Sequence, residues 1–223
     1  MGPKLMIDMR MQAEALGAEL TSGLVTKVSR NEKNFVLTLD DGSSINTRTI
    51  IIATGATPRR LNCAGESTYW AKGVTTCAIC DGALYKDKPV VIVGGGDTAM
   101  ESASFMLNFT KEITIIQNLP ALSASAAMQE RIIKNPLITI IYNSTVQEIV
   151  GNESHVTGVV ISPINNPTQK TTLHADALFL AVGLTPNTQA FEGLVELTPS
   201  KHLKIFEHTH TSVPGHFWSR RRG

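Results

Sequence analysis

The chain has 223 residues, of which 42% are hydrophobic, so it is long enough for one large or two modest domains with apolar cores. Its 20 basic and 19 acidic residues leave a formal net charge of +1, which argues against nucleic acid or an anionic membrane as partner. The sequence contains no secretory signal pattern and no apolar run of the roughly 18 residues that a membrane span needs. Three cysteines are too few for a secreted disulfide framework, so we expect a cytoplasmic protein.

The first part of the chain predicts a helix followed by a small antiparallel unit. Leu5, Met9, Ala13 and Leu16 recur at helical spacing, and the helix is expected to end near Gly17. The period then changes to that of strands, which we expect at 24–28, at 35–39 and, after a turn at 41–42, from residue 45 into a buried run at 49–55.

The middle of the chain predicts a strand, helix, strand unit. Apolar runs at 89–93 and 113–116 flank a helical stretch at 97–109. Further strands are expected at 137–143, 155–161 and 177–183. The alternation of strands and helices indicates an α/β fold.

Two distant segments resemble each other. Residues 49–58, TIIIATGATP, and 177–186, ALFLAVGLTP, are each a buried strand that ends in Gly and then Pro. If both are crossings between domains, residues 61–182 are inserted into a domain formed by 1–60 and 183–223. The alternative is that each is an ordinary glycine turn after a buried strand.

A glycine-rich segment follows the strand at 89–93. Gly94, Gly96 and Ala99 fit the G-x-G-x-x-G/A pattern at the start of a helix. The first glycine allows the tight turn, the second lets a pyrophosphate approach the backbone, and the small third residue lets the helix pack on the strand. The pattern predicts a dinucleotide site; a merely structural turn is the alternative.

The cofactor's adenosine ribose is expected beside the end of the next strand, at Gln117 and Asn118. Both side chains are neutral, and no arginine lies within 111–130 to bind a 2′-phosphate. These residues favour NADH over NADPH.

Cys77 and Cys80 have the spacing of half a zinc knuckle, of an inert small pair or of a redox dithiol. Zinc needs about four ligands. The remaining candidates are Cys63 and scattered histidines, of which only His208 and His210 are close together, far down the chain, so the redox interpretation is favoured. Asp81 could carry the proton that thiol exchange requires. Cys63, which has no partner at motif spacing, is expected to be a packed thiol.

Taken together, these motifs closely resemble low-molecular-weight thioredoxin reductase. The motifs are Cys-Ala-Ile-Cys-Asp-Gly, then Val-Gly-Gly-Gly-Asp-Thr-Ala, with Ala-Thr-Gly upstream and Pro-Asn after the second glycine strand. The resemblance implies a Rossmann-like nicotinamide-dinucleotide domain that carries the dithiol and is inserted into an FAD-binding domain. It implies electron flow from NADPH through FAD to the cysteines and on to thioredoxin, in a homodimer.

The resemblance also implies roles for individual residues. Cys80 would face the flavin, Cys77 would attack the disulfide of thioredoxin, and Asp81 would handle the proton. The expected contacts with FAD are Thr54 and Gly55. The expected contacts with the nicotinamide dinucleotide are Gly94, Gly95, Gly96, Asp97, Thr98 and Ala99.

The sequence departs from the family pattern in three places. The family's arginines after the second strand are replaced by a stretch that includes Gln117, Asn118, Leu119 and Ser123. The strand and glycine-rich loop that hold the FAD pyrophosphate do not precede Met1. From residue 216 the chain reads HFWSRRRG, which a frameshift explains better than a basic patch for nucleic acid. We therefore expect an incomplete FAD-binding domain with weakened FAD binding.

Three functions are consistent with these patterns. The first is a thioredoxin-disulfide reductase that uses NADPH or NADH and acts on thioredoxin or a thioredoxin-like protein. The second is a catalytically silent fragment that retains only the dinucleotide-binding module. The third is a divergent reductase that uses NADH or another electron donor.

Overall fold

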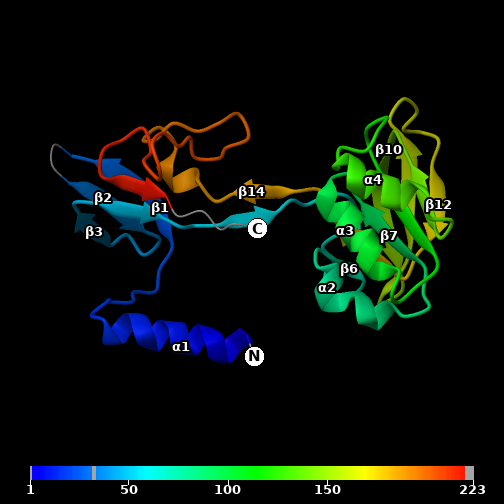
Figure 1. Cartoon of the computed structure of the whole chain (residues 1–223), viewed down its shortest axis with the longest axis horizontal. Coiled ribbons are helices and arrows are strands. Elements are labelled where there is room, and N and C mark those ends of the chain that lie inside the picture. The colour runs from blue at the N-terminus through cyan, green and yellow to red at the C-terminus, as the bar shows by residue number, and fades with distance from the viewer. Residues whose placement is uncertain (1, 32–33, 219–223) are drawn as a thin grey trace. The chain divides into compact units, whose positions relative to one another are not determined.

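The computed structural model describes residues 2–31 and 34–218 (Figure 1). The chain forms two compact units: unit 1 runs to Gly55 and resumes at Pro186, and unit 2 comprises Ala56–Thr185. The division lies at the two glycine-to-proline segments singled out in the sequence, although the expected bounds were residues 60 and 183. The difference arises because the short strands that follow the two glycines pair with each other as β5 and β14.

Unit 1 contains a three-stranded antiparallel sheet in the order β1-β2-β3, and a separate parallel pair formed by β4 and β15. Its apolar core includes Val28, Phe35, Ile52 and Phe191. The predicted frameshift product falls largely on 219–223, outside the described residues. The elements of unit 1 are α1 (Gly2–Ala15), β1 (Val25–Arg30), β2 (Phe35–Leu39), β3 (Ser44–Thr47), β4 (Ile50–Ile52), η2 (Gln189–Phe191) and β15 (His216–Trp218).

Helix α1 forms as the sequence predicts, but it buries none of its residues. Leu5 and Met9, on the expected apolar face, are 59% and 55% exposed. Met6, Ile7 and Met11 are exposed to a similar degree, so apolar side chains surround the helix rather than form one stripe. The spacing of the apolar residues thus correctly predicted a helix, but it did not predict that no side of the helix is buried.

Unit 2 is built on a parallel sheet of five strands in the order β6-β13-β7-β8-β9, with an antiparallel meander β10-β11-β12. The α/β class predicted from the sequence is confirmed. The elements of unit 2 are β5 (Ala56–Pro58), β6 (Val74–Thr75), α2 (Ala78–Asp81), η1 (Gly82–Tyr85), β7 (Val90–Val93), α3 (Asp97–Met106), β8 (Ile113–Ile116), α4 (Ala126–Ile133), β9 (Ile138–Ile141), β10 (Ser144–Gly151), β11 (Val156–Pro163), β12 (Thr171–His174), β13 (Ala177–Leu180) and β14 (Leu184–Pro186).

The parallel sheet is the middle of three layers (Figure 1). Because side chains alternate along a strand, Val90 and Ile92 pack into a cluster with helix α3, and Val91 and Val93 pack into a second cluster with the meander. All four residues of β7 are buried. This explains why β7 is a continuous apolar run rather than an alternating one.

The strand order creates a crevice at the carboxyl edge of the sheet. From β7 the chain proceeds to β8 and β9 on one side, and it returns on the other side as β13. Ligands of open parallel sheets bind where the order reverses, beside the carboxyl ends of the strands. Here that point lies between β7 and β13.

A buried carboxylate organises the segment that leads from β5 into unit 2. Glu66 is 2% exposed, and its two oxygens accept hydrogen bonds from the backbone N–H groups of Leu61 and Asn62. Arg60 completes the set with an ion pair of 3.2 Å to Glu66, and its guanidinium lies 3.5 Å from the ring centre of Trp70. The segment is therefore held by one satisfied buried acid.

We expect Glu66→Ala to lower the free energy of unfolding by about 3 kcal/mol, because two backbone donors and an arginine lose their acceptor. Urea denaturation followed by circular dichroism measures this. The control is Glu153→Ala, an exposed residue at which a change within about 0.5 kcal/mol is expected. Equal midpoints for the two variants would contradict the role of Glu66.

Candidate functional site

Two of the three consecutive glycines after β7 are required by their close neighbours. Gly94 has a φ of 129°, and a Cβ there would collide with the backbone oxygen of Ala181 at the end of β13. A Cβ on Gly95 would collide with the side-chain amide of Gln117. The glycine loop is thus closely packed between the ends of β13 and β8.

Gly96 serves a different purpose. It is the N-cap of α3 with a φ of −87°, which suits any residue, and a Cβ there would lie 3.8 Å from the Ser123 hydroxyl as its nearest neighbour. The open space in front of Gly96 faces a cavity rather than the protein interior. Ala99 is fully buried, so the small residue allows α3 to pack closely on the sheet.

The cavity has a volume of about 610 Å³ and lies in the crevice at the switch in strand order. Its wall is made by the segments that follow β7, β8 and β13, by the start of β10 and by the chain after β5. Among the described residues that line it, Arg59 is the one charged side chain, and no carboxylate is present. The lining is therefore compatible with an anionic ligand.

The residues expected to contact the ribose differ in their availability. Gln117 is 3% exposed, donates to the backbone oxygen of Ala121 at 3.0 Å and accepts from the Asn118 N–H at 3.1 Å. Its amide therefore helps to shape the loop, and Gln117 also lines the cavity, so the expected ribose contact stays a prediction. Asn118 and Leu119 line the cavity as exposed residues.

Two residues in the first turn of α3 have different roles. Thr98 lines the cavity. Asp97, expected to contact the dinucleotide, accepts a hydrogen bond of 2.8 Å from the Ser125 N–H before α4. Asp97 thus ties the start of α3 to the start of α4.

Arg59 was not among the residues predicted from the sequence. It precedes Arg60 in the chain segment after β5, and its N–H donates to the Gly183 oxygen at 3.0 Å. This bond places Arg59 at the β13 side of the glycine loop, opposite Asn118 at the β8 side. No local motif marks this position, since it depends on the pairing of β5 with β14.

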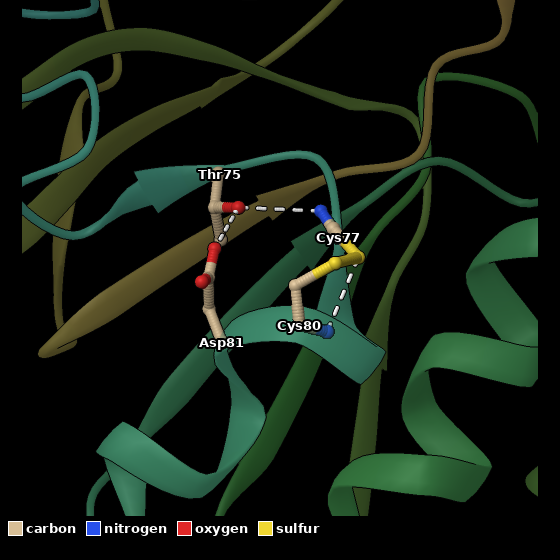
Figure 2. Close-up of a disulfide and its surroundings, with 4 residues drawn as sticks. All are labelled: Thr75, Cys77, Cys80 and Asp81. Carbon is tan, nitrogen blue, oxygen red and sulfur yellow. Dashed lines mark hydrogen bonds between the residues drawn. A yellow bond between two sulfur atoms is a disulfide. The ribbon is translucent and has the colours of Figure 1, made fainter. Parts of the chain in front are cut away.

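The two cysteines lie at the same carboxyl edge, after β6. Cys77 and Cys80 form a disulfide with their α-carbons 5.3 Å apart. Cys77 is also the N-cap of the short helix α2, and its sulfur accepts a hydrogen bond of 3.1 Å from the Cys80 N–H (Figure 2). The two sulfurs are thus close enough to bond to each other, which the redox interpretation requires.

Asp81 is connected to this pair through Thr75. The Thr75 hydroxyl donates to a carboxylate oxygen of Asp81 at 2.5 Å and accepts from the Cys77 N–H at 3.2 Å (Figure 2). Thr75 was not predicted as a site residue, although its position two residues before Cys77 was a usable signal. A hydroxyl thus joins the acid to the backbone of the first cysteine.

Two further groups near the sites keep their protons. Burial, together with the carboxylates of Asp81 and Asp176, raises the pKa of the Tyr85 phenol. Burial also raises the pKa of the Cys63 thiol, with Glu66 adding to the effect. Cys63 is half-buried and packs against the meander-side core as a free thiol, in line with the packed thiol expected from the sequence.

Thr54 and Gly55 close unit 1 at the start of the segment between the units. The Thr54 hydroxyl donates to the Asn187 oxygen at 2.6 Å, and the Asn187 side chain donates back to the Thr54 oxygen at 3.0 Å. Gly55 has a φ of 67° and open space where a Cβ would lie. These contacts bring the Ala-Thr-Gly and Pro-Asn segments together.

Residues 2–31 and 34–218 offer neither a cluster of metal ligands nor a membrane-spanning helix. These residues contain no group of three or more His, Cys, Asp or Glu side chains able to hold a metal ion. No described helix has both the length and the apolar character needed to cross a bilayer.

Comparison with known proteins identifies relatives along almost the whole chain. Residues 9–218 match the family described as pyridine nucleotide-disulphide oxidoreductase. The chain is 39% identical over 218 residues to a thioredoxin reductase of Spironucleus barkhanus, a match that covers 97% of this chain and 71% of that protein. It is 39% identical over 220 residues to NADPH-dependent thioredoxin reductase 3 of Arabidopsis thaliana, covering 97% of this chain and 41% of that protein.

A solved structure gives the same result. Thioredoxin reductase from Giardia duodenalis superposes with a TM-score of 0.74 at 38% sequence identity, covering 97% of this chain and 71% of that one. The likeness therefore extends through both units of the chain.

We expect Gly96→Ala to weaken NADH binding by about tenfold or more, because its methyl group would project toward the cavity where a phosphate must approach. Fluorescence titration with NADH measures the affinity, and urea denaturation should show a midpoint close to that of the unaltered chain.

Gly95→Ala is the matched control, since its methyl group would collide with Gln117 and lower the urea midpoint. Unchanged NADH affinity in the folded Gly96→Ala variant would show that the ligand does not lie over this loop.

Proposed function

We propose a function for this chain, which belongs to the pyridine nucleotide-disulphide oxidoreductase family and, within it, to the thioredoxin reductases. Electrons pass from a reduced nicotinamide dinucleotide through FAD to Cys77 and Cys80. From the dithiol they pass to the disulfide of thioredoxin or a thioredoxin-like protein. The observation that carries the proposal is the reducible Cys77–Cys80 disulfide, joined to a carboxylate at the same sheet edge as the glycine loop.

Unit 2 is the proposed nicotinamide-dinucleotide domain. The glycine loop at the start of α3, the open space before Gly96 and a cavity lined by Arg59 without carboxylates all suit a pyrophosphate. The helix dipole of α3 adds favourable charge at the same place.

Among its described lining residues, the cavity has no charged group that would select strongly between NADH and NADPH. Its described lining offers no acid to bind the two ribose hydroxyls of NADH, and no arginine at Asn118 or Leu119 to bind a 2′-phosphate. Arg59 lies instead on the β13 side of the glycine loop, and this loop is where the pyrophosphate common to both cofactors would bind. We therefore propose that Arg59 binds this shared group.

Unit 1 is the proposed FAD-binding unit. Open space at Gly55 and the fixed backbone of Thr54 and Asn187 are compatible with the approach of a flat ring system to this segment. When bound, FAD supplies the relay that accepts a hydride and delivers two electrons to a disulfide. The homodimer implied by the family resemblance stays a prediction.

The contacts of the two cysteines support different roles for them. In the reduced form, the Cys80 N–H that the Cys77 sulfur accepts would stabilise a Cys77 thiolate, which makes Cys77 the attacking sulfur. Cys80 then releases the product by attacking Cys77. Asp81, next to Cys80 in the chain, is the group that we propose takes and returns the proton.

We expect Arg59→Gln to weaken the binding of NADH and NADPH by a similar factor of about ten, the usual value of a charge-assisted contact. Fluorescence titration of both cofactors measures the two affinities. Lys111→Gln removes an equal charge from an exposed site of unit 2 outside the cavity lining and should change neither affinity.

A loss confined to NADPH would instead place Arg59 on the 2′-phosphate. Arginines introduced at Asn118 and Leu119 provide the opposite contrast, because they should raise the affinity for NADPH over NADH.

The roles of the cysteines are tested with the chain reduced by dithiothreitol, freed of reductant and mixed with oxidised thioredoxin. The unaltered chain should reduce one thioredoxin per Cys77–Cys80 pair. Cys80→Ser should instead accumulate a mixed disulfide with thioredoxin, visible by non-reducing electrophoresis and mass spectrometry, whereas Cys77→Ser should form none. Trapping by Cys77→Ser alone would reverse the roles, and no transfer from the unaltered chain would refute the proposed function.

A further inference from the structure

Thr75 lies where the sheet meets the dithiol. It is the last residue of β6, it pairs in register with Phe179 of β13, and its neighbour Val74 is fully buried. Asp81, in contrast, ends a helix of four residues, and its side chain is partly exposed. Thr75 is thus paired to the sheet, whereas Asp81 lies in a short helix outside the sheet.

The hydrogen bonds at Thr75 have a defined direction. The Cys77 N–H can only donate, so the Thr75 oxygen is the acceptor of that bond at 3.2 Å. The hydroxyl hydrogen remains free to be donated, and the Asp81 oxygen Oδ2 lies 2.5 Å away to accept it (Figure 2). The sequence of donors thus runs from Cys77 through Thr75 to Asp81.

From this geometry we propose that Thr75 is the positioning residue of the dithiol site, which holds Asp81 by one oxygen and leaves the other free to exchange protons with the sulfurs. The inference rests on the proposed function and adds a residue to it. Thr75 touches neither sulfur through its hydroxyl in the hydrogen bonds described, so it acts through Asp81. Tyr85 is a further ionisable group near Asp81: burial, with the carboxylates of Asp81 and Asp176, raises the pKa of its phenol and keeps it neutral. Asp176 in turn forms an ion pair with Lys88 at 3.8 Å.

The step that depends on this arrangement is a dithiol–disulfide exchange. The Cys77 thiolate bonds to one sulfur of thioredoxin and breaks its disulfide, and the first thioredoxin thiolate leaves. Cys80 then gives up its proton and bonds to Cys77, which breaks the mixed disulfide and releases the second thiolate. Two electrons move from the protein dithiol to thioredoxin, and the two protons of the protein thiols end on the thioredoxin thiols.

The leaving thiolate decides whether an acid is needed. Ordinary cysteine thiolates are basic, so their departure is assisted by a proton donor, whereas an aromatic thiolate of low pKa leaves without one. The disulfide reagent 5,5′-dithiobis(2-nitrobenzoate) releases such aromatic thiolates. It therefore reports the reactivity of the cysteines without reporting proton delivery.

The test compares Thr75→Val, which has nearly the same shape without the hydroxyl, with Thr75→Ser, which keeps the hydroxyl. Each full chain is reduced by dithiothreitol, desalted and mixed with oxidised thioredoxin or with the aromatic disulfide. We expect Thr75→Val to slow the single turnover with thioredoxin by about tenfold, less than the roughly hundredfold or greater slowing that loss of a proton-transfer group itself causes, because Thr75 acts through Asp81. Thr75→Ser should stay within about twofold, and all chains should react with the aromatic disulfide at similar rates.

Several outcomes would overturn the inference. It fails if Thr75→Val reduces thioredoxin as fast as the unaltered chain, or if both substrates slow in the same proportion, which would indicate a general distortion. Thr75→Ala serves in the same comparison if the valine variant does not fold. Asp81→Asn separates this inference from the proposed function: a slow Asp81→Asn with a fast Thr75→Val refutes Thr75 alone, whereas a fast Asp81→Asn refutes the proton role of Asp81.

Discussion

The close approach of two backbones, Gly94 after β7 and Ala181 after β13, is the constraint on which the rest of unit 2 depends. A side chain at residue 94 would separate the two strand ends, and the crevice between them would lose its floor. Because all five strands run in one direction, this contact also determines where the other carboxyl ends lie. Cavity and disulfide share one edge of the sheet as a consequence of parallel pairing.

The same edge supports the two sites in different ways. The cavity uses backbone groups, since glycines leave room for a phosphate and the start of α3 presents its N–H groups. The dithiol site uses a side chain, Thr75, because helix α2 is too short to be rigid by itself. The Thr75 hydroxyl connects strand β6, and so the sheet, to Asp81 by one hydrogen bond. Strand ends therefore position the reactive groups, and the loops carry them.

The parts of the site that local sequence predicts are those with a local cause. The glycine spacing predicts a turn into a helix, and the cysteine spacing permits a disulfide, because both are set within a few residues. Arg59 depends on a strand pair between segments more than 120 residues apart, so no local pattern marks it. Gln117 shows what a local pattern leaves out. Its position after β8 predicts a ligand contact, but the pattern does not predict that its amide forms hydrogen bonds with the backbone of the following loop. Helix α1 shows the same limit for packing, because a helical period does not say what will cover an apolar side chain.

Charge separates the two sites along their common edge. The described lining of the cavity holds a cation and no carboxylate, which favours a ligand that carries several negative charges. The dithiol site instead holds a carboxylate, Asp81, whose charge adds to burial in raising the pKa of Tyr85. A carboxylate in the cavity would repel the pyrophosphate, and an arginine beside Asp81 would hold that group in its ionised form and hinder its return of a proton. Each site thus requires the charge that would impair the other, and a sheet edge wide enough to separate them is the simplest scaffold that accommodates both.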